Sequence, residues 1–305
     1  MSDHSVRVGS VTLDNPIMTA SGTAGQSDEL SAYMDLSKLG AVVVKSLSLD
    51  PWLGNPAPRL HGTESGMINA VGLQNPGVEK WLEAGLPSLL DSGAKVVASI
   101  WGRTIQEYGE IAERLSGTPG ISAVEVNVSC PNLESSGEMF AHHPDTCAAV
   151  VEAALCANMP LWVKLSPNVT DLVPVAAAAM AAGAESLTLT NTVMGLVIDP
   201  ETRRPILGNK GGGLSGPSIR PIALRSVYDI YAALGPIPIV GVGGITKGSH
   251  VVEFLAAGAS AVQVGSAHFA DPRASQKILL DLERWCRKRN IASVRDLTGA
   301  AHDSQ

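Results

Sequence analysis

Residues 237–269 read IPIVGVGGITKGSHVVEFLAAGASAVQVGSAHF, and the same pattern occurs twice within them. In each copy a short apolar run, at 237–242 and at 261–264, leads through glycine into a helical pattern. Continuous apolar runs are typical of parallel strands that are covered on both faces. Parallel neighbours also need a crossover of the length that a helix supplies. The stretch therefore predicts consecutive strand–helix units of a parallel sheet.

Similar units precede this stretch along most of the chain. Further apolar runs lie at 17–20, 41–44, 96–98, 123–126, 161–163 and 186–189, and helical patterns lie at 104–115, 144–157, 171–182, 217–234, 249–257 and 271–288. Eight such units fit a closed barrel better than an open sheet, and 305 residues is an ordinary length for one barrel. We therefore expect a single α/β domain over residues 1–305, a (β/α)8 TIM barrel preceded by a β-hairpin at residues 6–13.

Two connections, at 45–75 and at 191–216, are too long for simple loops. Both follow predicted strands, so both would lie on the catalytic face of a barrel. Long loops in such places commonly act as lids or binding loops. We expect the same here.

Composition and charge exclude several classes of protein. The net charge is −7 and the chain contains no block rich in lysine and arginine, which argues against a nucleic-acid or anionic membrane partner. No apolar run approaches the roughly 20 residues of a membrane span, and the start of the chain does not resemble a signal peptide. The four cysteines lack the spacing of a zinc or iron–sulfur site. These features predict a cytoplasmic location and no bound metal.

Polar residues or glycines follow the predicted strands, where the chemistry of a barrel is found. Two lysines, Lys45 and Lys164, end otherwise apolar runs, and burying them is costly unless an anion or strong acceptors compensate. They either face anionic groups of a ligand or reach the rim and are solvated there. Asn127, Asn132 and Asn191 supply amide donors and acceptors for a planar ligand with carbonyl and N–H groups.

The last two strand ends predict a phosphate site. Gly243 and Gly244 follow the seventh strand, and Gly265 and Ser266 follow the eighth. Glycine lets the backbone approach a ligand closely, and N–H groups at a helix start bind anions. The segment 212–216, which reads GGLSG, could add further backbone donors.

The role of Cys130, in the segment NVSCPN, is open on chemistry alone. A free cysteine is most often a small buried hydrophobe. As a base at neutral pH it would need help, because a free thiol has a pKa of about 8.5. Ser129 or a nearby lysine could provide that help.

Six motifs occur in a characteristic order. They are GNPAPR (54–59), NAVGLQNPG (69–77), NVSCPN (127–132), VKLSPNVTD (163–171), TNT (190–192) and GGLSGP (212–217). Together they resemble the class 1 dihydroorotate dehydrogenases, most of all the class 1B type, over nearly the whole chain. The resemblance implies flavin-dependent oxidation of dihydroorotate to orotate in pyrimidine biosynthesis.

The resemblance also implies ligands and roles. One FMN per chain would contact Ser21, Lys45, Ser46, Ser99, Asn127, Lys164, Thr190, Gly216, Gly243, Gly244, Gly265 and Ser266, with Lys164 at the N1/O2 edge of the ring. Dihydroorotate would contact Lys45, Asn69, Ala70, Val71, Gly72, Leu73, Asn127, Asn132, Asn191 and Thr192. Cys130 would act as the base while hydride passes to FMN N5, under a closed loop that follows Lys45.

Class 1B enzymes form a homodimer core within a heterotetramer, in which a second subunit carries FAD and a 2Fe–2S cluster and passes electrons to NAD+. This chain has neither cysteines spaced for a cluster nor a strand–GxGxxG–helix site. The partner would therefore supply the groups that carry electrons to NAD+. A fumarate-linked homodimer of class 1A remains an alternative. Two departures stand out: Ser99, where the family often has asparagine, and the bulky Trp101.

Three other interpretations remain. A flavin-free barrel could use Lys45 or Lys164 as a Schiff-base amine on a phosphorylated substrate. A flavoprotein could act on another pyrimidine, as in the related domain of dihydropyrimidine dehydrogenase. A barrel kept as a structural subunit is the third, although such a protein need not retain costly buried polar groups.

Overall fold

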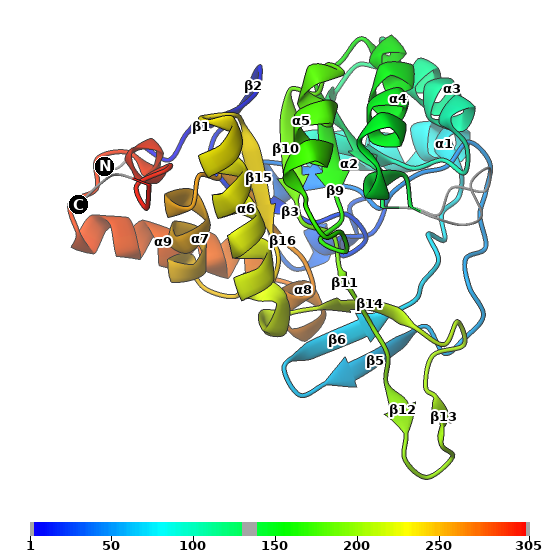
Figure 1. The fold of residues 1–305 in the computed structure, drawn as a ribbon. Coiled ribbons are helices and arrows are strands. Elements are labelled where there is room, and N and C mark those ends of the chain that lie inside the picture. Colours follow the sequence, from blue (N-terminus) through cyan, green and yellow to red (C-terminus); the bar gives the residue numbers. More distant parts are fainter. Residues whose placement is uncertain (1–2, 130–138, 303–305) are drawn as a thin grey trace.

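The computed structural model describes residues 3–129 and 139–302, and its central feature is a sheet of eight parallel strands (Figure 1). The strands are β3 (Ile17–Thr19), β4 (Val42–Val43), β7 (Val96–Ile100), β8 (Ile121–Asn127), β9 (Leu161–Leu165), β10 (Ser186–Leu189), β15 (Ile239–Val242) and β16 (Ala261–Val264). Each pairs with the next in chain order. A parallel bridge between Met18 and Ala41 joins β3 to β4 and closes the sheet. The predicted (β/α)8 barrel is confirmed.

Helices cover the outside of the barrel (Figure 1). They are α1 (Val78–Lys80), α2 (Leu86–Asp91), α3 (Ile105–Leu115), α4 (Pro144–Ala154), α5 (Val173–Ala181), α6 (Arg220–Leu234), α7 (Gly248–Ala256), α8 (Ala267–Ala270) and α9 (Ala274–Lys288). The first unit differs from the predicted pattern, because only 3-10 turns at Glu29–Ala32 and Leu36–Lys38 lie between β3 and β4. That segment is rich in Gly, Ser and Asp, whose side chains compete for backbone hydrogen bonds. Asp35 does so by accepting from the N–H of Ser37.

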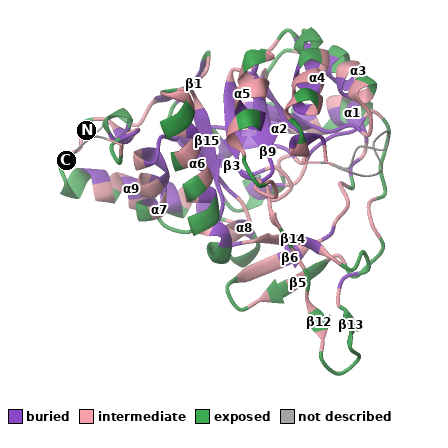
Figure 2. Cartoon of the chain, in the orientation of Figure 1, coloured by how far each residue is buried: buried purple, intermediate pink, exposed green. Residues whose placement is uncertain are grey.

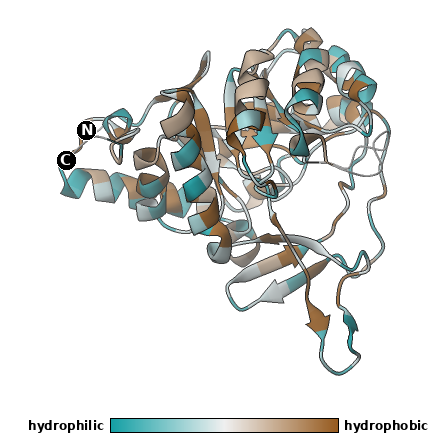
Figure 3. Cartoon of the chain, in the orientation of Figure 1, coloured by the Kyte–Doolittle hydropathy of each residue, from teal (hydrophilic) through white to brown (hydrophobic). Residues whose placement is uncertain are grey.

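The core fills the barrel and the space beneath the helices. The barrel strands are buried along almost their whole length (Figure 2). Helix α3 shows how the outer layer packs: Tyr108, Ile111 and Leu115 are buried on one face while its charged residues lie on the other (Figure 3). Removing such side chains from water stabilises the fold by roughly 1.5–3 kcal/mol each. The result is a scaffold in which the strand ends are held in place.

The N-terminal hairpin closes one end of the barrel. Strands β1 (Val6–Val8) and β2 (Val11–Leu13) pair as predicted. The backbone N–H of Ser10 donates to Glu185 at 2.8 Å, and the ammonium of Lys95 donates to the carbonyl of Thr12 at 2.7 Å. Glu185 and Lys95 immediately precede β10 and β7, so the hairpin lies at the amino ends of the strands. The carboxyl ends are left for a ligand site.

The two long connections form a second sheet, where the sequence predicted loops. Strands β5 (Leu60–Thr63) and β6 (Gly66–Asn69) come from the first, and β11 (Val193–Gly195) and β14 (Gly212–Ser215) from the second. They pair antiparallel in the order β11–β14–β6–β5. The sequence does not predict β14, because glycine has low strand propensity. A Cβ at Gly213 would collide with the side chain of Thr192, so tertiary packing requires the glycine.

A small hairpin extends this sheet away from the barrel. Strands β12 (Ile198–Asp199) and β13 (Arg204–Pro205) pair antiparallel at its tip (Figure 1). Near the hairpin, Met194, Leu196 and Ile198 each expose more than half of their surface. Within residues 3–129 and 139–302, the helices are all too short or too polar to cross a membrane.

We predict that Gly248→Ala destabilises the fold. Gly248 opens α7, and a Cβ there would collide with the backbone of Asp281 and Leu282 in α9. Overpacking of this kind lowers the free energy of unfolding by about 1–3 kcal/mol. Urea denaturation followed by circular dichroism measures the change. Gly62→Ala is the matched control, because a Cβ at Gly62 meets nothing within 4 Å; equal stability of the two variants would contradict the prediction.

Candidate active site

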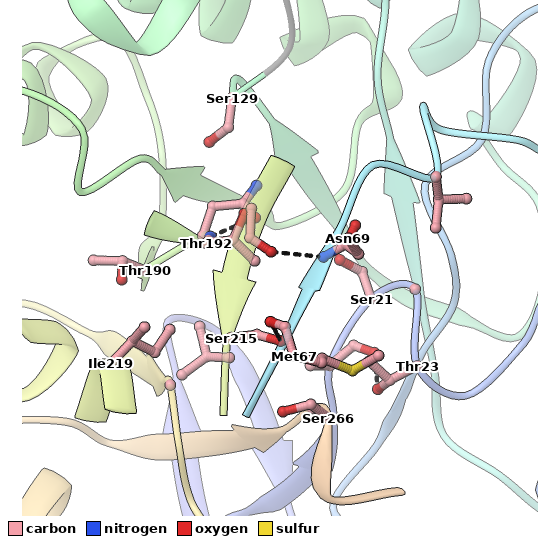
Figure 4. A pocket seen from close by; sticks show the side chains of 18 of the residues that line it. Ser21, Thr23, Met67, Asn69, Ser129, Thr190, Thr192, Ser215, Ile219 and Ser266 are labelled. Carbon is pink, nitrogen blue, oxygen red and sulfur yellow. Dashed lines mark hydrogen bonds between the residues drawn. The ribbon is translucent and has the colours of Figure 1, made fainter. Parts of the chain in front are cut away.

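A cavity of about 310 Å³ opens at the carboxyl ends of the barrel strands, between the barrel and the second sheet (Figure 4). This volume is that of a small-molecule site. The sequence-predicted residues that line it are Ser21, Lys45, Ser46, Asn69, Ala70, Val71, Gly72, Leu73, Asn127, Lys164, Thr190, Asn191, Thr192, Gly216, Gly243, Gly244, Gly265 and Ser266. They come from separate parts of the chain, and the fold brings them together.

Glycine turns form one end of the cavity. Gly243 and Gly244 have φ values of +147° and +65°, which favour glycine. Gly265 lines the cavity, and a Cβ on it would make only ordinary contacts with Ala20 and Thr23, at 3.5 Å and 3.9 Å. Turns of this shape let a ligand anion approach the backbone.

The helix after the Gly243–Gly244 turn contributes less than the sequence suggested, whereas α8 begins directly after Ser266 and its Ala267 lines the cavity. Helix α7 begins only at Gly248, and neither Gly248 nor Lys247 lines the cavity. The N–H of Thr246 donates to Nδ1 of His250 at 3.2 Å. The turns themselves, rather than the first turn of α7, therefore face the ligand space.

Lys164 lies on the floor of the cavity and is almost fully buried. Its ammonium nitrogen is 3.1 Å from Ser21 Oγ, 3.3 Å from Gln263 Oε1 and 3.5 Å from Glu125 Oε1. Of the two roles left open for this lysine, solvation at the rim does not fit its burial. Burying a lone ammonium is costly, and here the compensating anion belongs to the protein. Sequence reasoning missed Glu125 and Gln263, although both interrupt apolar strands.

Amide side chains form one wall of the cavity. Asn191 Nδ2 donates to Asn127 Oδ1 at 3.2 Å, and Asn127 Nδ2 donates to Ser46 Oγ at 3.3 Å. Asn69 Nδ2 donates to the carbonyl of Gly213 at 3.2 Å, a bond that ties β6 to β14 (Figure 4). These contacts fix the orientation of the amides, which suits a ligand with several carbonyl and N–H groups.

The motifs GNPAPR and NAVGLQNPG contact each other beside this wall. Arg59 donates to the carbonyls of Asn55 and Leu53, at 2.5 Å and 2.9 Å, and to Gln74 Oε1 at 2.5 Å. The N–H of Asn55 donates to the carbonyl of Val71 at 3.1 Å. Arg59 thus holds the segment 69–73 against the cavity without lining it.

Ser99 and Trp101 are placed differently from the other predicted residues. Ser99 is fully buried inside β7 and does not line the cavity; its hydroxyl lies 2.9 Å from Ser46 Oγ and 3.5 Å from Glu125 Oε1. Trp101 is buried against Trp52, edge to face at 5.7 Å.

Cys130 and Asn132 lie outside the described residues. Where the structure describes the chain, no group of three or more His, Cys, Asp or Glu residues is placed to hold a metal ion.

Comparison with known proteins gives the family. The model of the family described as dihydroorotate dehydrogenase matches residues 4–285. The chain belongs to the dihydroorotate dehydrogenase family. Relatives from Trichlorobacter lovleyi and Desulforudis audaxviator, each called dihydroorotate dehydrogenase B (NAD(+)), catalytic subunit, are 48% identical over 297 and 298 residues, with 97% of each chain covered. A protein of that name from Geobacter sulfurreducens is 47% identical over 299 residues, with 98% of each chain covered. The resemblance drawn from the six motifs is confirmed.

Dihydroorotate dehydrogenases are flavin-dependent, and two features of this cavity fit a flavin nucleotide. Thr190 lines the cavity, and its Oγ1 is buried with no hydrogen-bond partner in the described part of the chain. An unpaired buried hydroxyl of this kind calls for a polar ligand. The glycine turns at Gly243 and Gly265 also line the cavity, and a phosphate would be held there.

A histidine is buried beside the glycine turns. His268 is 5% exposed, and its Nε2 lies 2.9 Å from Ser275 Oγ. Burial lowers the pKa of His268 to about 4, against smaller opposing effects from the Gly265 backbone and Asp271.

We predict that stability falls as the pH drops from 6.5 towards 4. In this window the unfolded chain binds a proton at His268 and the folded chain does not, so protonation favours unfolding. The loss is about 3 kcal/mol for a shift of this size. Urea denaturation at several pH values measures it, and His268→Gln should flatten the slope. If the variant and the parent chain lose stability in parallel, His268 is not the cause.

Proposed function

We propose that this chain is the catalytic subunit of a class 1B dihydroorotate dehydrogenase, which oxidises dihydroorotate to orotate in pyrimidine biosynthesis. The supporting observation is the cavity itself, which joins glycine turns, a buried lysine and a wall of fixed amides. The names of the relatives agree with this substrate and with a catalytic subunit. A flavin-free barrel does not fit membership of this family.

In this proposal residues 1–305 form a single domain that binds one FMN. The residues that would hold it are Ser21, Lys45, Ser46, Ser99, Asn127, Lys164, Thr190, Gly216, Gly243, Gly244, Gly265 and Ser266. The glycine turns would hold the phosphate, and Lys164 would face the N1/O2 edge. Ser99 would act indirectly, because its hydroxyl contacts Ser46 and Glu125 and does not reach the cavity. FMN bound there would supply the hydride acceptor, at N5.

The substrate would lie between the flavin and Cys130. Its carbonyl and N–H groups would bind Lys45, Asn69, Ala70, Val71, Gly72, Leu73, Asn127, Asn132, Asn191 and Thr192. Cys130 would take the proton from one ring carbon while the neighbouring carbon loses hydride. Because the amides already bond one another, the substrate would meet donors and acceptors that are oriented in advance.

Electrons would leave through a partner subunit that carries FAD and a 2Fe–2S cluster and reduces NAD+. The chain itself contains no dinucleotide-binding or cluster motif. We further propose a homodimer core within a heterotetramer and a cytoplasmic location. The names of the relatives, which specify NAD(+) and a catalytic subunit, support the first part of this proposal.

The central test is anaerobic mixing of dihydroorotate with the purified protein. We expect the visible absorbance of oxidised flavin to bleach. Cys130→Ala should keep its flavin and bleach at least a hundredfold more slowly, as expected for the loss of a general base. Dihydrouracil is the control substrate and should leave the spectrum unchanged.

Colourless protein that releases no flavin on denaturation would refute the proposal. Faster bleaching by dihydrouracil than by dihydroorotate would assign the site to another pyrimidine. Normal turnover by Cys130→Ala would remove this residue as the base.

The partner proposal predicts a second result. The chain alone should pass electrons from dihydroorotate to artificial dyes but not to NAD+, because it lacks the groups that connect the two. Adding the electron-transfer subunit should produce NADH, measured by its absorbance. Efficient NAD+ reduction by the pure chain would overturn the need for a partner, and efficient fumarate reduction would favour the class 1A alternative.

A further inference from the structure

A pair of polar side chains lies inside the barrel directly beneath the cavity. Glu125 on β8 and Gln263 on β16 are fully buried, and neither lines the cavity. Gln263 Nε2 donates to Glu125 Oε2 at 2.5 Å, while Gln263 Oε1 accepts from the Lys164 ammonium at 3.3 Å. The amide of Gln263 is therefore fixed in orientation by a donor on one side and an acceptor on the other.

This arrangement holds Lys164 in one position. The ammonium has three hydrogens, and the three oxygens of Ser21, Gln263 and Glu125 lie within 3.5 Å of its nitrogen. Glu125 supplies the only charge among these acceptors, and at 0% exposure water does not screen it. The position of Lys164 and the net charge of the cavity floor thus both depend on Glu125.

Glu125 is also linked to the amide wall. From Glu125 the contacts run through the hydroxyl of Ser99 at 3.5 Å to that of Ser46, 2.9 Å further on. Asn127 then donates to Ser46 at 3.3 Å, and Asn191 donates to Asn127 at 3.2 Å. In this path the hydroxyl of Ser99 links Glu125 to Ser46 below the cavity.

We propose that Glu125 is a positioning residue that acts through Lys164 and sets the balance between oxidised and reduced flavin at this site. The proposal rests on the proposed function, in which the flavin N1/O2 edge lies at Lys164. Reduction adds negative charge to that edge, and an ammonium facing it favours the reduced form. The Glu125 carboxylate offsets the ammonium and so restrains that preference. Interactions of this kind are strong in a site that excludes water.

The test is the midpoint potential of the bound flavin in Glu125→Gln, measured anaerobically against reference dyes. Glutamine keeps the size of the side chain and an oxygen that can accept from Gln263, but removes the charge. We expect the ratio of affinities for reduced and oxidised flavin to rise at least tenfold, a shift of about 30 mV for a two-electron couple. Glu185→Gln is the matched control, since it makes the same change of charge at the hairpin end of the barrel, away from the cavity, and it should shift the ratio less than twofold.

A second comparison covers the case in which Glu125→Gln does not fold. Lys164→Met leaves the carboxylate buried alone, whereas Lys164→Met with Glu125→Leu replaces the whole ion pair by apolar side chains, an exchange that proteins commonly tolerate. Because Glu125 acts through Lys164, and a carboxylate buried alone takes up a proton, the single and double variants reconstituted with excess FMN should differ less than twofold in their preference for reduced flavin.

The outcomes distinguish a failure of the proposed function from a failure of the proposed role of Glu125. Parent protein that binds no flavin would overturn both. Flavin-loaded Glu125→Gln with an unchanged or lower potential would overturn only the role of Glu125, as would a tenfold difference between the single and double variants at Lys164.

Discussion

Closure of eight parallel strands is the constraint on which the rest of this molecule depends. Once β3 and β4 meet through Met18 and Ala41, every strand points the same way around one ring. Residues from all parts of the chain then meet at the carboxyl rim, because each strand ends there. The N-terminal hairpin covers the opposite end through Glu185 and Lys95, which leaves the rim as the place for a ligand.

The second sheet turns this rim into an enclosed site. Strands β5, β6, β11 and β14 come from two connections more than 100 residues apart, and pairing β14 with β6 converts both into a wall. The strands of this wall pair each other's backbone N–H and carbonyl groups. The wall can therefore face the ligand without leaving backbone groups unpaired. Arg59 adds a further restraint on the segment 69–73, next to the site.

The ammonium of Lys164 is buried at the floor of the cavity, but a nearby carboxylate offsets its charge. The cavity is therefore not strongly positive. Lys164 on β9 is paired with Glu125 on β8, and Gln263 on β16 bridges them across the barrel interior. Leaving any one of these groups unpaired would be costly in the dry core. Such a network favours a single arrangement of its members. Through Ser99 and Ser46 the network also connects the floor of the cavity to its amide wall.

The sequence by itself determined the alternation of strands and helices, the family motifs and most of the residues around the cavity. Periodicity and strand ends are local features, and a closed parallel barrel puts every strand end on one rim. Tertiary structure alone decided that Glu125 neutralises Lys164, that Ser99 lies below the cavity, and that glycine-rich residues 212–215 form a strand. It also decided that α7 begins beyond the glycine turn. These facts depend on which side chains face each other across the barrel, and spacing along one chain carries no information about contacts between distant strands.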